Sequence, residues 1–110
     1  MKTVNILGTE YTIEIKSKSE DHYLNDADGY CDKTSHKIVI LDKDDECQLD
    51  DFEAYQHKVM RHEIIHAFHF ESGIAENFEC KPYGFPESLV DWFAIQFPKM
   101  QKAFEEADCL

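Results

Sequence analysis

The sequence predicts an α+β protein in which a small sheet comes first and helices follow. Two stretches in the first forty residues have the pattern of β-hairpins, and from residue 52 onward the apolar positions have helical spacing. The chain has 110 residues and a hydrophobic content of 43%, which suits one compact core. We therefore expect a single domain over residues 1–110, with an antiparallel or mixed sheet of about three or four strands.

Two hairpins are expected in the first half of the chain. The stretch VNILGTEYTIEI alternates on both sides of Gly8-Thr9, which predicts a β-hairpin over residues 2 to 15. A polar segment follows, and GYCDKTSHKIVIL then predicts a second hairpin, whose better strand is Lys37 to Leu41.

A long helix is expected after the acidic loop DKDDECQLDD. Asp50 or Asp51 can cap a helix that begins near Phe52, and helical spacing of apolar residues continues to about Phe70. Gly73 suits the C-terminal cap of this helix.

Prolines mark the boundaries of the elements that follow. Pro86 can occupy the first position of a helix containing ESLVDWFAIQF, and Pro98 is expected to end or kink that helix. The stretch KMQKAFEEA then predicts a short C-terminal helix.

Net charge argues against one class of partner, and the distribution of apolar residues argues against another. The formal net charge of −12, from 11 basic and 23 acidic residues, repels the phosphates of nucleic acid. No signal peptide and no apolar run of membrane-spanning length are evident, so we expect a cytoplasmic protein without a membrane partner. The sequence leaves the oligomeric state open.

The stretch RHEIIHAFHFE, residues 61 to 71, carries the most specific chemistry. His62 and His66 are four residues apart, so on a helix their side chains point within about 40° of each other and can bind one ion. Glu63 follows the first histidine and lies beside the position of a metal-bound water. This HExxH pattern therefore predicts two metal ligands and a general base.

A catalytic zinc site needs a third protein ligand. Glu87 is the strongest candidate, because Asp91 follows it by four residues and can orient a ligand histidine. His69 shares the histidine face but lies about 10 Å along the helix axis from His62, which makes it a poor third ligand. Cys80 is chemically suitable but has no supporting pattern.

The paired motifs HEIIH, at 62–66, and ESLVD, at 87–91, resemble those of the gluzincins, the zinc metallopeptidases of the thermolysin type. In size the chain is similar to minimal gluzincins and to the core of ImmA/IrrE-type peptidases of phages and mobile elements. The resemblance implies a zincin-like fold with Zn²⁺ held by His62, His66 and Glu87. It also implies that Glu63 is the general base and acid, and that Asp91 contacts a zinc-binding histidine.

The same resemblance implies zinc-dependent hydrolysis of a peptide or protein, with a narrow regulatory protein as the expected substrate. Gluzincins bind substrate as an added strand at a sheet edge, and the residues expected to form that edge here are Lys37, Ile38, Val39, Ile40 and Leu41. Tyr83 and His69 are the two candidates for stabilising the transition state. The alternative is a non-catalytic zinc-binding interaction protein, against which the presence of Glu63 argues, since a structural metal needs no base.

Overall fold

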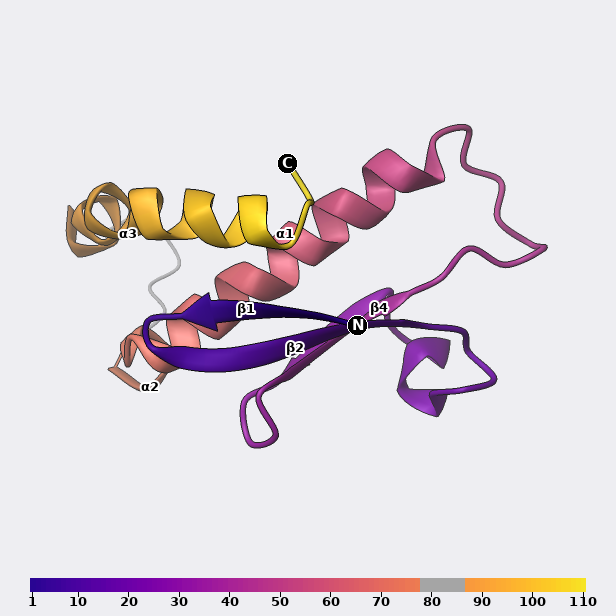
Figure 1. Ribbon diagram of the computed structural model, residues 1–110, viewed down its shortest axis with the longest axis horizontal. Helices are drawn as coiled ribbons and strands as arrows, with labels where there is room; N and C mark the ends of the chain where they lie inside the picture. Colours follow the sequence, from indigo (N-terminus) through magenta and orange to yellow (C-terminus); the bar gives the residue numbers. More distant parts are fainter. Residues whose placement is uncertain (78–86) are drawn as a thin grey trace.

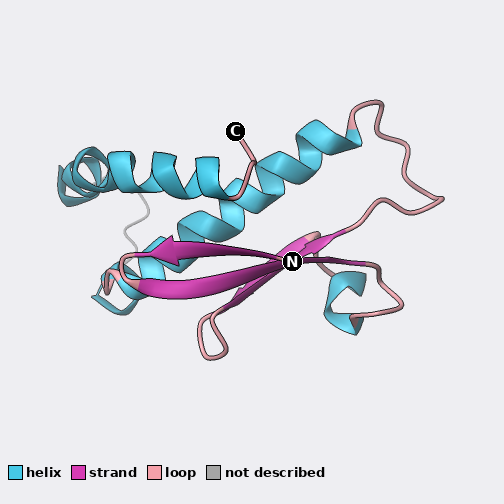
Figure 2. Cartoon of the chain, in the orientation of Figure 1, coloured by secondary structure: helices cyan, strands magenta, loops and turns pink. Residues whose placement is uncertain are grey.

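A computed structural model describes residues 1–77 and 87–110, apart from the side chains at positions 77, 87–91 and 94. Its elements, in chain order, are β1 (Lys2–Ile6), β2 (Thr9–Lys16), the 3₁₀ turn η1 (His22–Asn25), β3 (Gly29–Asp32), β4 (Lys37–Leu41), α1 (Phe52–Glu71), α2 (Ile74–Asn77) and α3 (Glu87–Glu106). The strands come before the α-helices in the chain, and Figure 2 shows both kinds of element, so the predicted α+β class is confirmed.

The four strands form one mixed sheet in the order β1-β2-β4-β3. Both predicted hairpins are present, because β1 pairs with β2 and β3 with β4 in antiparallel fashion. The first hairpin turns at Leu7 and Gly8, which both have positive φ (53° and 95°), and the side chain of Asn5 accepts a 2.7 Å hydrogen bond from the Gly8 N–H. The inner pair, β2 and β4, is parallel.

The predicted edge strand, Lys37 to Leu41, is not at an edge. This segment is β4, and its backbone pairs with β2 on one side and with β3 on the other. It therefore has no free edge to accept a substrate strand, and that prediction is wrong. Among the described residues β3 pairs with β4 alone, which makes β3 the edge strand on this side of the sheet.

Helix α1 begins and ends where the sequence predicts. Asp51 is its N-cap, and the carboxylate accepts a 3.0 Å hydrogen bond from the Ala54 N–H. At the other end, the Ser72 N–H donates to the Phe68 carbonyl at 2.9 Å, and Gly73 follows with φ of 81°.

The second long helix differs from its prediction. The helix expected to follow Pro86 and the short helix expected after Pro98 are one element, α3, with Pro98 inside it. Figure 1 shows that α3 changes direction along its length, as expected for a helix kinked by proline. The half that follows Pro98 buries Met100, Ala103 and Phe104 in the core, and this packing offsets the hydrogen bond that the proline removes.

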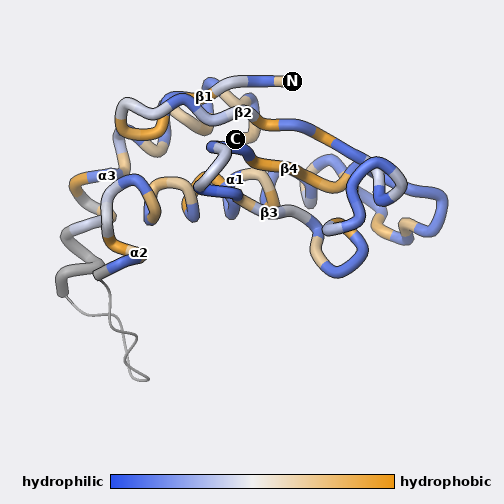
Figure 3. Tube along the Cα trace, turned by 90° about the horizontal axis from the view of Figure 1, so that it is seen from below, coloured by the Kyte–Doolittle hydropathy of each residue, from blue (hydrophilic) through white to orange (hydrophobic). Residues whose placement is uncertain are grey.

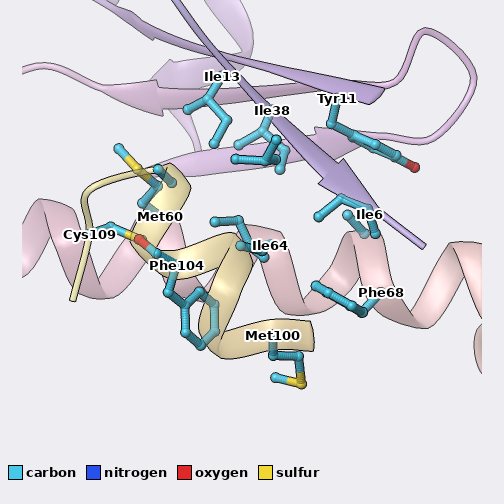
Figure 4. Close-up of a cluster of buried hydrophobic side chains, with 14 of the residues drawn as sticks. Ile6, Tyr11, Ile13, Ile38, Met60, Ile64, Phe68, Met100, Phe104 and Cys109 are labelled. Carbon is cyan, nitrogen blue, oxygen red and sulfur yellow. The ribbon is translucent and has the colours of Figure 1, made fainter. Parts of the chain in front are cut away.

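Helices α1 and α3 cover one face of the sheet with a shared apolar core. Figure 4 shows Ile38 of the sheet pointing toward Ile64 of α1, and the same buried cluster includes Phe68 of α1 and Phe104 of α3. Ile38, Ile64 and Phe68 are fully buried. In Figure 3 the apolar colouring is continuous along β4, in agreement with the central position of that strand in the sheet.

A polar contact joins the first hairpin to the end of α1. The buried Tyr11 hydroxyl donates to the Glu71 carboxylate at 2.8 Å, and the Thr9 hydroxyl donates to the same group at 3.1 Å. His36 Nε2 lies 3.9 Å from Glu71. Glu71 therefore links the end of α1 to β2.

We expect Glu71→Ala to lower the free energy of unfolding by about 1–3 kcal/mol, because the Tyr11 hydroxyl loses its acceptor. Tyr11→Phe removes the donor, so in that background the same change should cost clearly less. Urea unfolding of the two single variants and the double variant measures this difference. Strictly additive costs would contradict the contact's role.

No helix in the described part of the chain is both long enough and apolar enough to cross a membrane.

Candidate metal site

His62 and His66 lie near the middle of α1, next to residues that are buried against the sheet. Ile64, Ala67 and Phe68 are fully buried against the sheet, which fixes the rotation of the helix about its axis. With that face inward, His62 is exposed and Glu63 is buried. The predicted helical placement of HExxH is therefore confirmed, and the core holds the motif in one orientation.

His62 and His66 point their imidazoles at each other. Their Nε2 atoms are 3.1 Å apart, and the ring centroids are separated by 4.7 Å with an interplanar angle of 72°. Two nitrogens bound to one tetrahedral zinc ion, at about 2.05 Å each, are roughly 3.3 Å apart. The geometry thus matches two ligands of a single ion.

Glu63 completes a compact group with the histidines. The ligand-type atoms of His62, Glu63 and His66 all lie within 4.8 Å of one another, so this group can hold a metal ion. Because imidazole and carboxylate donors suit several divalent metals, the arrangement establishes a possible metal site and leaves the metal unidentified.

The protonation of these groups follows from burial. Burial raises the pKa of the Glu63 carboxyl, with His62 acting in the opposite direction, and the side chain is only 7% exposed. Burial, followed by the charge of His62, lowers the pKa of His66. A lowered pKa favours the neutral imidazole, which is the form that binds metal.

A cleft opens beside the group, between α1 and the edge strand β3. A hollow of about 350 Å³ is lined by Gly29, Tyr30, Cys31, His62, Glu63, His66 and Phe70. A second hollow of about 230 Å³ shares the walls formed by Gly29, His62 and Glu63 and extends toward the start of α1. The histidines and the glutamate are therefore accessible to a ligand that lies along β3.

Gly29 permits the close approach of β3 to α1. A Cβ atom at this position would be 2.9 Å from Val59 Cγ1 and 3.1 Å from the Val39 carbonyl oxygen. Both distances are shorter than ordinary contacts, so a side chain here would have to displace Val59 of α1 and would also crowd the backbone of β4.

We expect Gly29→Ala to lower the free energy of unfolding by about 1–3 kcal/mol through overpacking. Val59→Ala removes the nearest contact, so Gly29→Ala should cost less in that background. Urea unfolding measures the cost of Gly29→Ala twice, once in the wild-type protein and once in the Val59→Ala variant. An equal cost in the two backgrounds would show that the contact with Val59 is not the cause.

His69 lies outside the three-residue group, next to the second long helix. Its ring packs edge-on to Trp92, with centroids 4.9 Å apart, and is 6.3 Å from the ring of His66. Its buried Nε2 atom has no hydrogen-bond partner among the described residues. The Trp92 indole N–H donates to the Ser72 hydroxyl at 3.1 Å, which ties α3 to the end of α1.

Three other predicted site residues fall where side chains are not described. Glu87 and Asp91 belong to the first turns of α3, but their side chains lie outside the described residues. Tyr83 lies outside the described backbone as well. The predicted roles of these residues as third ligand, orienting carboxylate and transition-state stabiliser therefore stay predictions.

Sequence reasoning missed Cys31, which lies in the cleft wall. Burial, followed by the negative charge of Glu63, raises the pKa of the Cys31 thiol to about 12. In the metal-free protein the thiol is therefore protonated at neutral pH, and the side chain packs against the apolar core. Only the strand order could have revealed it, since no sequence motif connects Cys31 with residues thirty positions later.

Comparisons of the chain with protein-family models, with curated proteins and with solved structures gave no match. The functional assignment therefore depends on the residues of the site.

Proposed function

We propose that the protein is a zinc-dependent metallopeptidase of the gluzincin type. The observation that carries this proposal is the 3.1 Å separation of the two Nε2 atoms, with the buried carboxyl of Glu63 next to them. Two imidazoles and an adjacent glutamate on one helix are the ligands and base that metal-assisted peptide hydrolysis requires.

His62 and His66 supply two of the three protein ligands in this proposal. Glu87 supplies the third, and Asp91, one turn further on, orients a ligand imidazole. The contacts of Trp92 with Ser72 and His69 support this ligand set, because they hold α3 beside the end of α1 that follows the histidines.

A bound zinc ion would polarise the scissile carbonyl and acidify a neighbouring water. Glu63 accepts the proton of that water and returns it to the departing amine. Its burial in the cleft wall supports this role, because burial raises the pKa of the Glu63 carboxyl and so makes the carboxylate a stronger base than an exposed one. His69 and Tyr83 are the candidates for stabilising the oxyanion.

The substrate is an extended protein segment that pairs with β3. Peptides that add to a sheet use the free backbone groups of an edge strand, and β3 lines the cleft together with the histidines. This assignment replaces β4, whose backbone is fully paired. By resemblance to the phage and mobile-element peptidases, we expect a narrow regulatory protein as the target.

Metal removal and restoration test the proposal. The purified protein is stripped with a chelator, zinc is returned stepwise, and cleavage of labelled, unfolded casein is followed. We expect activity to disappear on stripping and to reach its maximum at one zinc per chain. A protein that binds one zinc and cleaves nothing would instead be the non-catalytic zinc-binding interaction protein.

A further inference from the structure

A third hollow adjoins the cleft at the start of α1. It has a volume of about 360 Å³ and lies under the acidic loop that joins β4 to α1. Its walls include Asp28, Tyr55 and Val59, and these three residues also line the hollow next to His62. The metal site and this third hollow are therefore two ends of one row of depressions along α1, which we call the acidic groove.

The inner wall of the third hollow is apolar and fixed in place. It is formed by Ile40 and Leu41 at the end of β4, together with Phe52 and Val59 of α1. The Gln56 side-chain amide donates to the Leu41 carbonyl at 3.1 Å, which holds the helix against the strand. Such a wall suits an aliphatic chain.

The rim of the hollow is strongly negative. Four carboxylates line it, and the one lysine among the lining residues, Lys18, has its Nζ 3.7 Å from Asp44. Asp28 accepts a hydrogen bond from the Tyr55 hydroxyl. Asp42 and Glu46 are exposed at the rim, where they can meet a cation.

We propose that the third hollow, at the end of the acidic groove away from the metal site, binds a lysine or arginine side chain of the substrate. These side chains combine an aliphatic stem with a cationic head, and the hollow combines an apolar wall with a carboxylate rim. This inference rests on the proposed peptidase function. It specifies the class of substrate as an extended segment with a basic residue near the cleaved bond.

The distance along α1 sets the position of that basic residue. The hollow centres on residues 52 to 59 and the histidines on residue 64, so the two sites are about 12 Å apart along the helix axis. An extended peptide covers this span with about four residues. The basic residue therefore lies about four positions from the scissile bond.

Peptide binding tests the inference without any need for cleavage. The zinc-loaded Glu63→Gln protein is titrated into fluorescein-labelled nonapeptides of alanine with arginine, norleucine or glutamate at the centre, in 0.15 M salt. Fluorescence anisotropy gives each affinity. We expect the arginine peptide to bind roughly tenfold more tightly than the norleucine peptide.

A matched pair of double variants separates the acidic groove from the general negative charge of the protein. Asp42→Asn/Glu46→Gln removes two rim carboxylates, whereas Asp45→Asn/Glu53→Gln removes the same charge from exposed neighbours that do not line the hollow. The first pair should reduce the preference for arginine to less than twofold, and the second should keep it.

The outcomes of this test differ from those of the peptidase test. Equal affinities for arginine and norleucine, absence of peptide binding, or a preference that survives the first double variant would overturn the inference, even if casein is cleaved. A preference lost only in the first double variant would support the groove, even if the wild-type protein cleaves nothing.

Discussion

The Glu63→Gln variant is expected to keep its zinc and to lose peptide cleavage by about 10²–10⁴-fold. Glutamine has the size of glutamate but cannot accept the proton of the attacking water. Zinc stoichiometry and casein cleavage, measured on the same preparation, check both halves of the expectation.

Two control measurements distinguish loss of the general base from a general defect of the variant protein. Glu53→Gln changes an exposed glutamate in the first turn of the same helix and should leave cleavage unchanged. Because burial raises the pKa of Glu63, its ionised form destabilises the metal-free fold at neutral pH, so Glu63→Gln should raise the melting temperature of the metal-free protein. Wild-type cleavage rates in Glu63→Gln would remove Glu63 from the mechanism.

Replacing His66 with alanine is expected to abolish stoichiometric zinc binding at micromolar protein concentration, and with it all cleavage. The remaining His62 imidazole and one carboxylate leave the ion with too few protein ligands for a catalytic site. Competition with a chromophoric chelator measures the affinity, and His62→Ala should behave in the same way.

His57→Ala is the matched control for the histidine variants. His57 lies on the same helix, where its Nε2 is 3.9 Å from Glu53, and it is not part of the metal-ligand group. Its replacement should leave both zinc affinity and cleavage within about twofold of wild type. Equal losses in His57→Ala and His66→Ala would mean that the helix, and not a metal site, had been damaged.

Local signals account for the parts of the fold that the sequence predicts well. The Asp51 cap, the Gly73 terminus and both hairpins depend on residues a few positions apart. The approach of His62 to His66 is of the same kind, since one helical turn brings the two imidazoles together. Such features need no knowledge of the tertiary structure.

Long-range pairing decides the parts that the sequence did not predict. The parallel pairing of β2 with β4 places β4 inside the sheet and moves β3 to its edge, and no local signal distinguishes this order from a simple meander. For the same reason, Gly29 and Cys31 could not be assigned to the cleft. The separate short helix predicted after Pro98 is absent for another reason: the buried residues that follow Pro98 continue α3.

The central claim is that His62 and His66 hold one zinc ion in a site open to substrate. A crystal structure of the zinc-loaded protein, with anomalous diffraction data at the zinc edge, tests it most directly. We predict one strong anomalous peak about 2.0–2.1 Å from the Nε2 atoms of His62 and His66, with the Glu87 carboxylate as third protein ligand. A peak elsewhere, or a zinc ion bound to only one of these histidines, would contradict the account.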